Sequence, residues 1–263
     1  MGEVIAFISI KGGVGKTTLS LETASSLAND FGKKVLVIDA NFSAPNIDLY
    51  SGLSPEMTLH DVLSGNIENA INAIHEKHNF DLLPAALYYK KAIDTLKLKE
   101  VVEKLRERYD FIILDSSPNF LELIPVIISS NRIFIVTTPD HQTLMTSIKA
   151  AKLARVKKTP IEGIIINKIR NPIYELDLKE VENMSDIPVV ARIKDDKVMS
   201  ESLFYRKPIT LHKKAHPISK EIKRFASAVC GEPEKVRWFM RNFSKEKVNR
   251  EIMRQAFYER MFK

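Results

Sequence analysis

Residues 7–19 read FISIKGGVGKTTL, and this short stretch decides what kind of fold the chain can take. Its apolar first half predicts a buried strand, and the apolar pattern that follows the glycines predicts a helix. A tight loop must join these two elements. The loop has the residue types and spacing of a phosphate-binding P-loop, namely Gly12, Gly13, Val14, Gly15, Lys16, Thr17 and Thr18.

The chemistry of phosphate binding explains why these residue types occur together. Glycines let successive backbone N–H groups curl round a phosphate because no Cβ atom stands in the way. The N-terminus of the helix adds its dipole and its free amides to the same anion. We expect Lys16 to reach the β- and γ-phosphates of a nucleotide and the Thr17 hydroxyl to ligate Mg²⁺. An ordinary strand-to-helix turn does not explain three glycines followed by Lys-Thr-Thr.

Length and composition indicate an ordinary globular protein. At 263 residues, with 44% hydrophobic and 28% charged residues, the chain is long enough for one large α/β domain or two small ones. Its apolar runs are shorter than the roughly 18 residues of a membrane-spanning helix, and we expect no secretion signal. The single cysteine, Cys230, excludes an internal disulfide and fits a reducing cytoplasm. We place His75 and His78 on a solvated helical face rather than in a metal site.

The net charge of +7 is unevenly distributed along the chain. From residue 211 to the end there are 14 Lys and Arg residues against 6 Asp and Glu residues, whereas the first 210 residues are nearly neutral. A basic surplus confined to one segment suggests an anionic partner, either nucleic acid or lipid headgroups.

Nearly continuous apolar segments alternate with helical patterns throughout the chain. We predict strands at 4–10, 35–39, 80–84, 111–114, 132–137, 161–166 and 189–193. We predict helices at 16–31, 58–63, 67–75, 96–108, 121–128, 142–156, 196–204 and 217–229. This order favours an α/β fold, a doubly wound and mainly parallel sheet with helices on both faces. We expect a P-loop domain at 1–230 and a C-terminal helical extension at 231–263.

Two of the predicted strands end in carboxylates. The apolar run 111–114 ends in Asp115, and the strand 35–39 ends in Asp39. Because the carboxyl ends of parallel strands meet at one edge of a sheet, we expect both side chains near the P-loop. A strand that delivers a carboxylate to a Mg²⁺ ion beside a P-loop is a Walker B arrangement. The predicted metal ligands are therefore Thr17, Asp115 and Asp39.

A second lysine, Lys11, precedes the loop, and the sequence KGGVGKTT resembles the deviant Walker A motif of the MinD/ParA ATPases. The resemblance covers about residues 3–230 and is closest to archaeal MinD-like proteins, through ISIKGGVGKTT and DANFSAPN. In that family the extra lysine crosses a dimer interface to the nucleotide of the partner. The resemblance therefore implies that the chain forms an ATP-dependent homodimer and that Lys11 has this role.

The same resemblance assigns further site residues and shows where this chain departs from the family. Strand 2 of the family usually ends Asp-x-Asp, and its second carboxylate orients the attacking water. Asn41 stands there in this chain, and an amide cannot accept a proton as a carboxylate can. We expect Asp39 and Asn41 to position water, and hydrolysis to be slow. A glycine of the family's second switch is replaced by Asn119-Phe120.

The base of the nucleotide is predicted from the strand 161–166. The family places an adenine-reading asparagine at the end of such a strand, and the resemblance assigns this role to Asn167. A guanine-selecting Asn-Lys-x-Asp sequence does not follow it, because Ile169 and Arg170 come next, so we expect ATP rather than GTP. The run 188–196 resembles the family's adenine loop, although Lys194 replaces its proline.

Three functions are open at this point. The first is an ATP-dependent dimerising switch of the MinD/ParA type, a Mg²⁺-dependent ATPase that acts with an unknown activating protein in cell division, chromosome partitioning or spatial positioning. The second is a nucleotide-binding scaffold that dimerises on ATP with little turnover. The third is a cofactor-assembly ATPase, which the missing Cys-x-x-Cys motif disfavours.

Residues 233–263 predict a long basic amphipathic helix with one tryptophan and several phenylalanines. This tail resembles the shorter C-terminal helix with which bacterial MinD proteins bind membrane. Three interpretations remain: the tail packs on the body or on a second subunit, it binds a membrane surface, or it binds nucleic acid or another partner. We expect a cytoplasmic protein, with a peripheral location at the inner face of the membrane if the second interpretation holds.

Overall fold

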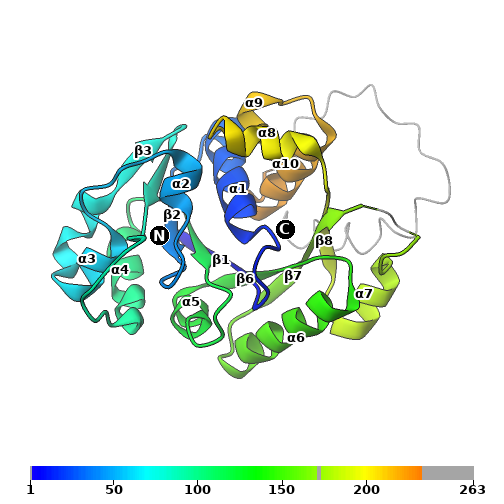
Figure 1. The fold of residues 1–263 in the computed structure, drawn as a ribbon, viewed down its shortest axis with the longest axis horizontal. Coiled ribbons are helices and arrows are strands. Elements are labelled where there is room, and N and C mark those ends of the chain that lie inside the picture. Colours follow the sequence, from blue (N-terminus) through cyan, green and yellow to red (C-terminus); the bar gives the residue numbers. More distant parts are fainter. Residues whose placement is uncertain (1, 171–172, 233–263) are drawn as a thin grey trace.

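An eight-stranded sheet runs through the computed structural model, which describes residues 2–170 and 173–232 (Figure 1). The strand order is β3-β4-β2-β5-β1-β6-β7-β8, and every neighbouring pair is parallel except β3 and β4. The strands are β1 (Glu3–Ile8), β2 (Val35–Ala40), β3 (His75–Lys77), β4 (Phe80–Leu83), β5 (Phe111–Ser116), β6 (Arg132–Thr137), β7 (Ile161–Ile169) and β8 (Val189–Lys194). The predicted doubly wound, mainly parallel sheet is confirmed.

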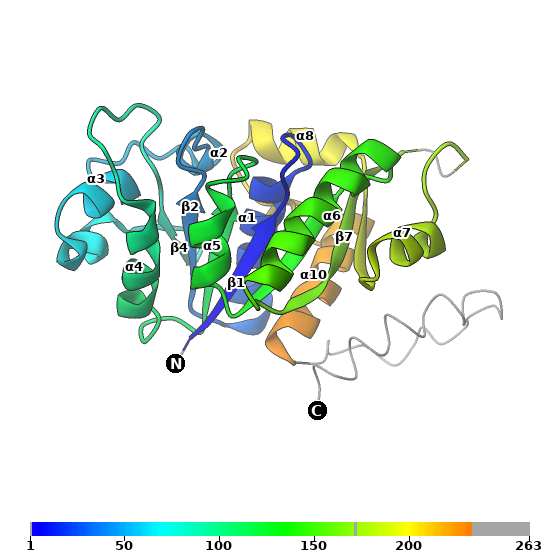
Figure 2. The same cartoon turned by 90° about the horizontal axis from the view of Figure 1, so that it is seen from below.

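Helices cover both faces of the sheet, as Figures 1 and 2 show. One face carries α1 (Lys16–Phe31), α2 (Ile47–Ser51), α8 (Lys197–Phe204), α9 (Ile209–His212) and α10 (Pro217–Cys230). The other carries α3 (Leu59–Ser64), η1 (Ile67–Ala73), η2 (Thr95–Lys97), α4 (Leu98–Leu105), α5 (Leu123–Ser129), α6 (His141–Val156) and α7 (Leu178–Ser185). Residues 233–263 of the helical extension predicted at 231–263 lie outside the residues described.

The core consists of two apolar layers, because successive side chains of a strand point to opposite faces. In β1 the side chains of Val4, Ala6 and Ile8 join one layer, whereas Ile5 and Phe7 join the other. All six positions of β2, β5 and β6 are buried, as expected for central parallel strands covered on both sides. Burial of each large side chain contributes roughly 1.5–3 kcal/mol.

The prediction of a helix through His75 was wrong. Residues 67–73 form a 3₁₀ helix, and His75 begins the antiparallel edge strand β3. His78 and Asn79 form the turn to β4 with φ angles of 58° and 66°. Asn29 of α1 holds this turn, since its Nδ2 donates to the His78 carbonyl at 3.0 Å. The two histidines therefore do not share a helical face.

Short elements account for the other differences from the predicted elements. The strand β3 and the helices α2, α7 and α9 were not predicted, and none of them exceeds eight residues. The start of α7 did have a recognisable signal, a capping box in which Asp177 and Glu180 bond each other's backbone amides. Strand β7 is longer than predicted, so Asn167 lies inside it rather than after it. No helix of the described residues is long and apolar enough to cross a membrane.

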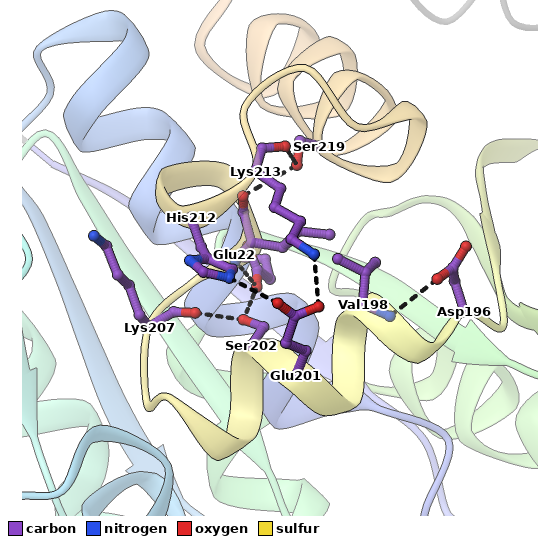
Figure 3. A network of polar contacts seen from close by, with 10 residues as sticks. Glu22, Asp196, Val198, Glu201, Ser202, Lys207, His212, Lys213 and Ser219 are labelled. Carbon is purple, nitrogen blue, oxygen red and sulfur yellow. Dashed lines mark hydrogen bonds and ion pairs between the residues drawn. The ribbon is translucent and has the colours of Figure 1, made fainter.

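Glu22, a buried carboxylate in the middle of α1, connects this helix to α8 and α9. Its oxygens accept hydrogen bonds from the backbone amides of Ile209 at 2.7 Å and Thr210 at 3.1 Å. The hydroxyl of Ser202 on α8 lies 3.5 Å away and also donates to the Lys207 carbonyl (Figure 3). Burial raises the pKa of Glu22 to about 7, although these donors oppose the shift. The protonated form is therefore favoured in the folded state more than in the unfolded chain.

We predict that Glu22 makes the free energy of unfolding depend on pH. A carboxyl whose pKa rises from 4.5 to about 7 on folding contributes stability below pH 4.5 and loses it as the pH rises toward 7. Relative to Glu22→Gln, the wild type should lose roughly 2–3 kcal/mol between pH 4.5 and 8 in urea unfolding. Glu103→Gln on the surface of α4 is the control. A stability difference between the wild type and Glu22→Gln that stays constant with pH would contradict the prediction.

Candidate functional site

The candidate site lies where the central parallel strands end, beside the loop from β1 to α1. Asp39 on β2 and Asp115 on β5 are direct neighbours in the register of the sheet, and Phe7 on β1 pairs with Asp115 from the other side. Strand β1 lies between β5 and β6, so the chain leaves β1 at a point where the strand order reverses. Ligands of open α/β sheets bind outside the strand ends at such a point.

The P-loop has the backbone that its glycines predict. Gly13 and Gly15 have φ angles of 75° and 95°, in the left-handed region that favours glycine. Gly15 is also the N-cap of α1, and its carbonyl accepts the first helical bond from Leu19 at 3.0 Å. A Cβ atom at Gly15 would lie 2.3 Å from Nδ2 of Asn167, whereas a Cβ at Gly13 would meet nothing within 4 Å. The first half of the loop is exposed at Gly12 and Gly13, whereas Val14 is buried.

Asn167 of β7 holds the P-loop through a hydrogen bond to its backbone. Its Nδ2 donates to the carbonyl of Val14 at 2.7 Å, and its side chain is buried. Because that amide donor is used by the loop, the residue fixes the position of Val14 and Gly15. Contact with adenine stays a prediction, and the loop contact is a role that the sequence did not indicate.

The two lysines of the motif occupy different environments. Lys16 is buried, and its Nζ lies 3.5 Å from the carbonyl of Lys11, folded back over the loop. Burial lowers the pKa of Lys16, and the charge of Asp115 partly opposes this shift. Lys11 itself is exposed at the surface of the loop. One ammonium group is therefore buried within the loop, and the other belongs to an exposed residue.

Asp115 faces the first turns of α1, as the Walker B arrangement requires. Its Oδ1 accepts a hydrogen bond from the Ser20 hydroxyl at 3.4 Å, and the Thr17 hydroxyl lies close enough to lower the pKa of the carboxyl. Burial raises its pKa, and the nearby Lys16 and these hydroxyls oppose the shift. The second oxygen, Oδ2, is buried and has no hydrogen-bond partner in the described structure. The structure thus brings together Thr17 and Asp115, the pair predicted from their motifs.

Asp39 is fully buried and anchors the loop that follows it. One oxygen accepts from the amide of Asn41 at 3.1 Å, and the other accepts from the amides of Asn46 at 2.9 Å and Ile47 at 3.0 Å. Its pKa is raised, first by burial and then by the charge of Asp115. The carboxylate therefore closes the loop 41–46 and begins α2. Its expected contact with Mg²⁺ or water stays a prediction.

Asn41 is buried at the start of this loop. Its Nδ2 donates to the carbonyl of Ala44, which also accepts from Asn46 at 2.8 Å. Its Oδ1 is buried without a partner in the described residues. A buried unpaired acceptor marks a place for a donor such as a water molecule. The amide thus has the free acceptor that positioning of a water needs, but no group that can take up its proton.

Sequence reasoning missed the side chains that hold the loop 41–46 from outside. His60 of α3 donates through Nε2 to the Phe42 carbonyl at 3.1 Å, because its Nδ1 accepts from Ala86 at 3.0 Å. Glu122 accepts hydrogen bonds from Ser43, which places the loop beside the segment after Asp115. These contacts join distant parts of the chain, and no local motif announces them.

The residues present fit a nucleotide with a divalent cation. Two buried oxygens without partners in the described structure lie at the ends of adjacent strands, Asn41 Oδ1 after β2 and Asp115 Oδ2 on β5. Oxygen atoms are the ligands that Mg²⁺ prefers, and it commonly uses only one or two protein ligands beside phosphate and water. The described residues contain no group of three or more His, Cys, Asp or Glu side chains that could hold a metal.

This geometry defines the class of P-loop nucleoside triphosphatases. A family model described as an AAA domain matches residues 2–159. The septum site-determining protein MinD of Synechocystis is 31% identical over 225 residues, which cover 81% of this chain and 84% of that protein. The chain belongs to the MinD/ParA family of P-loop ATPases, which confirms the resemblance. An uncharacterized ATP-binding protein of Methanocaldococcus jannaschii is 29% identical over 236 residues, 88% of this chain and 89% of the relative.

Solved structures of the family share this fold. The cell division ATPase MinD of Pyrococcus furiosus has a TM-score of 0.80 at 28% identity and covers 86% of this chain and 98% of its own. MinD of Pyrococcus horikoshii, solved with Mg-ADP, has a TM-score of 0.80 at 27% identity, with coverages of 87% and 96%. A MinC:MinD complex of Aquifex aeolicus gives 0.79 at 26% identity, with coverages of 90% and 98%.

We predict that Gly15→Ala disturbs the P-loop far more than Gly12→Ala. The new Cβ would lie 2.3 Å from Nδ2 of Asn167 on a backbone with φ of 95°, so the bond from Asn167 to Val14 must move. A left-handed backbone costs roughly 1–3 kcal/mol for an ordinary residue. The nearest atom to a Cβ at Gly12 is 4.0 Å away. Urea unfolding should resolve the two variants, and equal losses of stability would contradict this account of the loop.

Proposed function

We propose that the chain binds Mg²⁺ and ATP at this site and uses them to switch between a monomer and an ATP-bound homodimer. The observation that carries the proposal is a loop with left-handed glycines whose buried Lys16 reaches back to the Lys11 carbonyl, close to the buried Asp115 with its unpartnered Oδ2. The structure of the Pyrococcus horikoshii relative with Mg-ADP supports the choice of ligand. In this role the chain is a Mg²⁺-dependent ATPase with slow turnover.

Each residue of the site has a proposed task. The backbone amides of residues 12–17 and the ammonium group of Lys16 bind the β- and γ-phosphates, and Thr18 contacts the α-phosphate. Thr17 and Asp115 hold the Mg²⁺ ion, which neutralises charge on the phosphate oxygens when it is bound. We propose that Asn167, which contacts the P-loop, also contacts the adenine base.

The proposed dimer rests on Lys11. Its side chain is exposed at the outer surface of the loop, where a second copy of the chain could bring its own nucleotide within reach. The MinC:MinD complex of Aquifex aeolicus supports a further protein partner for this chain. We propose a role in cell division, chromosome partitioning or spatial positioning, in which an activating protein accelerates ATP hydrolysis.

Asn41 separates the switch from the second candidate, a scaffold that binds ATP with little turnover. The amide can orient a water through its free Oδ1, but the proton of that water must go elsewhere. Loss of a positioned base costs roughly 10²–10⁴-fold in rate. The third candidate, a cofactor-assembly ATPase, stays disfavoured by the missing Cys-x-x-Cys motif.

We predict that Asn41→Asp raises the steady-state rate of Mg²⁺-dependent ATP hydrolysis at least about tenfold, because it restores a proton acceptor. The carboxylate loses the bond from Asn41 to Ala44, but Asn46 still donates to that carbonyl, so the loop should keep its shape.

Lys16→Ala should abolish ATP binding in calorimetry. Lys11→Ala should keep binding and lose ATP-dependent dimerisation, and a Lys16→Ala variant that still binds ATP would refute the site.

The basic tail provides a separate prediction, although residues 233–263 lie outside the described structure. If the tail is a membrane helix, binding to anionic vesicles should require ATP and partly survive high salt, since buried apolar side chains contribute ~1.5–3 kcal/mol each. Binding to DNA would instead fall steeply with salt, because it depends on phosphate contacts. Deletion of residues 233–263 should abolish vesicle co-sedimentation, and unchanged co-sedimentation would exclude a membrane role for the tail.

A further inference from the structure

Glu122 connects the two loops that flank the P-loop on the side of Asp39 and Asp115. We propose that it is the positioning residue that makes these loops, residues 41–46 and 117–122, respond to the nucleotide as one unit. The inference rests on the proposed function, because it concerns how two loops of the proposed ATP site respond to the bound nucleotide. Nothing in the motifs of either loop indicates this residue.

Three hydrogen bonds carry the inference. Glu122 accepts from the backbone amide of Ser43 at 3.3 Å through Oε2 and from the Ser43 hydroxyl through Oε1. Oε1 also accepts from Nδ2 of Asn119 at 3.2 Å. Both oxygens of one carboxylate are thus directed at a single residue of the opposite loop, and the third bond braces the carboxylate against its own segment. Hydrogen bonds to a charged acceptor are stronger than those between neutral groups.

Glu122 and Ser43 are each held in place by neighbouring parts of the structure. Glu122 immediately precedes α5, whose first residue, Leu123, is fully buried in the core. The loop of Ser43 is closed at its base by the bonds from Asn41 and Asn46 to Asp39. A displacement of either loop must therefore break the contact between Ser43 and Glu122 or carry the other loop with it.

Each of the linked loops follows a strand that carries one of the two buried carboxylates, Asp39 on β2 and Asp115 on β5. Asn41, with its Oδ1 unpaired in the described structure, lies two residues before Ser43. On the other side, Pro118 approaches the P-loop, since a Cβ on Gly12 would lie 4.0 Å from its Cγ. Any ligand that moves Pro118 or Asn41 thus acts on both loops through Glu122. The two loops, residues 41–46 and 117–122, therefore form one element whose conformation a ligand can shift from either side.

The alternative is that these bonds only stabilise a surface turn. A purely structural contact would change overall stability and would weaken the binding of ADP and of an ATP analogue alike. A positioning contact changes the discrimination between the two nucleotides, because only one of them carries the γ-phosphate. The ratio of the two affinities therefore separates the interpretations.

The test is calorimetric titration of the full chain with Mg²⁺ and either ADP or the non-hydrolysable analogue AMP-PNP. Glu122→Ala should weaken AMP-PNP binding about tenfold and leave ADP binding within about twofold, since it removes a charge-assisted contact. Ser43→Ala should have a smaller effect of the same kind, and the double variant should match Glu122→Ala. Glu122→Gln should lie between, because it keeps one acceptor oxygen. Glu103→Ala, which removes a surface carboxylate from α4, is the control.

Two results would overturn the proposal: equal weakening of both nucleotides in Glu122→Ala, or independent effects of Glu122→Ala and Ser43→Ala that multiply in the double variant. Failure of the wild type to bind either nucleotide would refute the proposed function instead. The link can still be judged in that case by amide hydrogen exchange without nucleotide. Glu122→Ala should speed exchange in residues 42–46 and 117–121 together, and a change in one segment alone would refute it.

Discussion

Two carboxylates buried side by side set the main constraint on this molecule. Asp39 and Asp115 occupy matching positions on the adjacent strands β2 and β5, inside a sheet covered on both faces. Burial of a charge is costly unless hydrogen bonds or cations compensate for it. Backbone amides provide part of this compensation for Asp39, and hydroxyls of α1 together with Lys16 provide part of it for Asp115. The loop 41–46 and the first turns of α1 are therefore arranged by the need to solvate these two groups.

Helix α1 connects the buried carboxylates to a distant part of the molecule. Its first turn faces Asp115, and its middle holds α8 and α9 through Glu22 (Figure 3). Both contacts are between buried polar groups, so neither partner can move without leaving a group unsatisfied. A single rigid helix thus joins the strand ends on one side to the segment after β8 on the other. The Ser202 hydroxyl, which donates to the Lys207 carbonyl, fixes the corner between α8 and α9.

The sequence was sufficient for the features that depend on local pattern. Long apolar runs identified the central strands, and the spacing of Gly15, Lys16 and Thr17 identified the P-loop, because backbone chemistry allows few other residues there. Short elements such as β3 and α2 were not predicted, because three to five residues are too few to show a periodic pattern of apolar side chains. The contacts of Asn167 and Glu122 were also unforeseen, because each joins segments whose proximity arises only from the strand order.

The two edges of the sheet bear on how copies of this protein can associate. One edge is β3, only three residues long and antiparallel, and the other is β8, in which Arg192 and Lys194 are exposed. A short strand and outward charges both discourage pairing of a sheet with its neighbour. Among the described residues, open-ended growth through edge strands is thus disfavoured at both sides of the sheet. These edges do not oppose contacts between copies that are made through loops or helices without adding strands to the sheet.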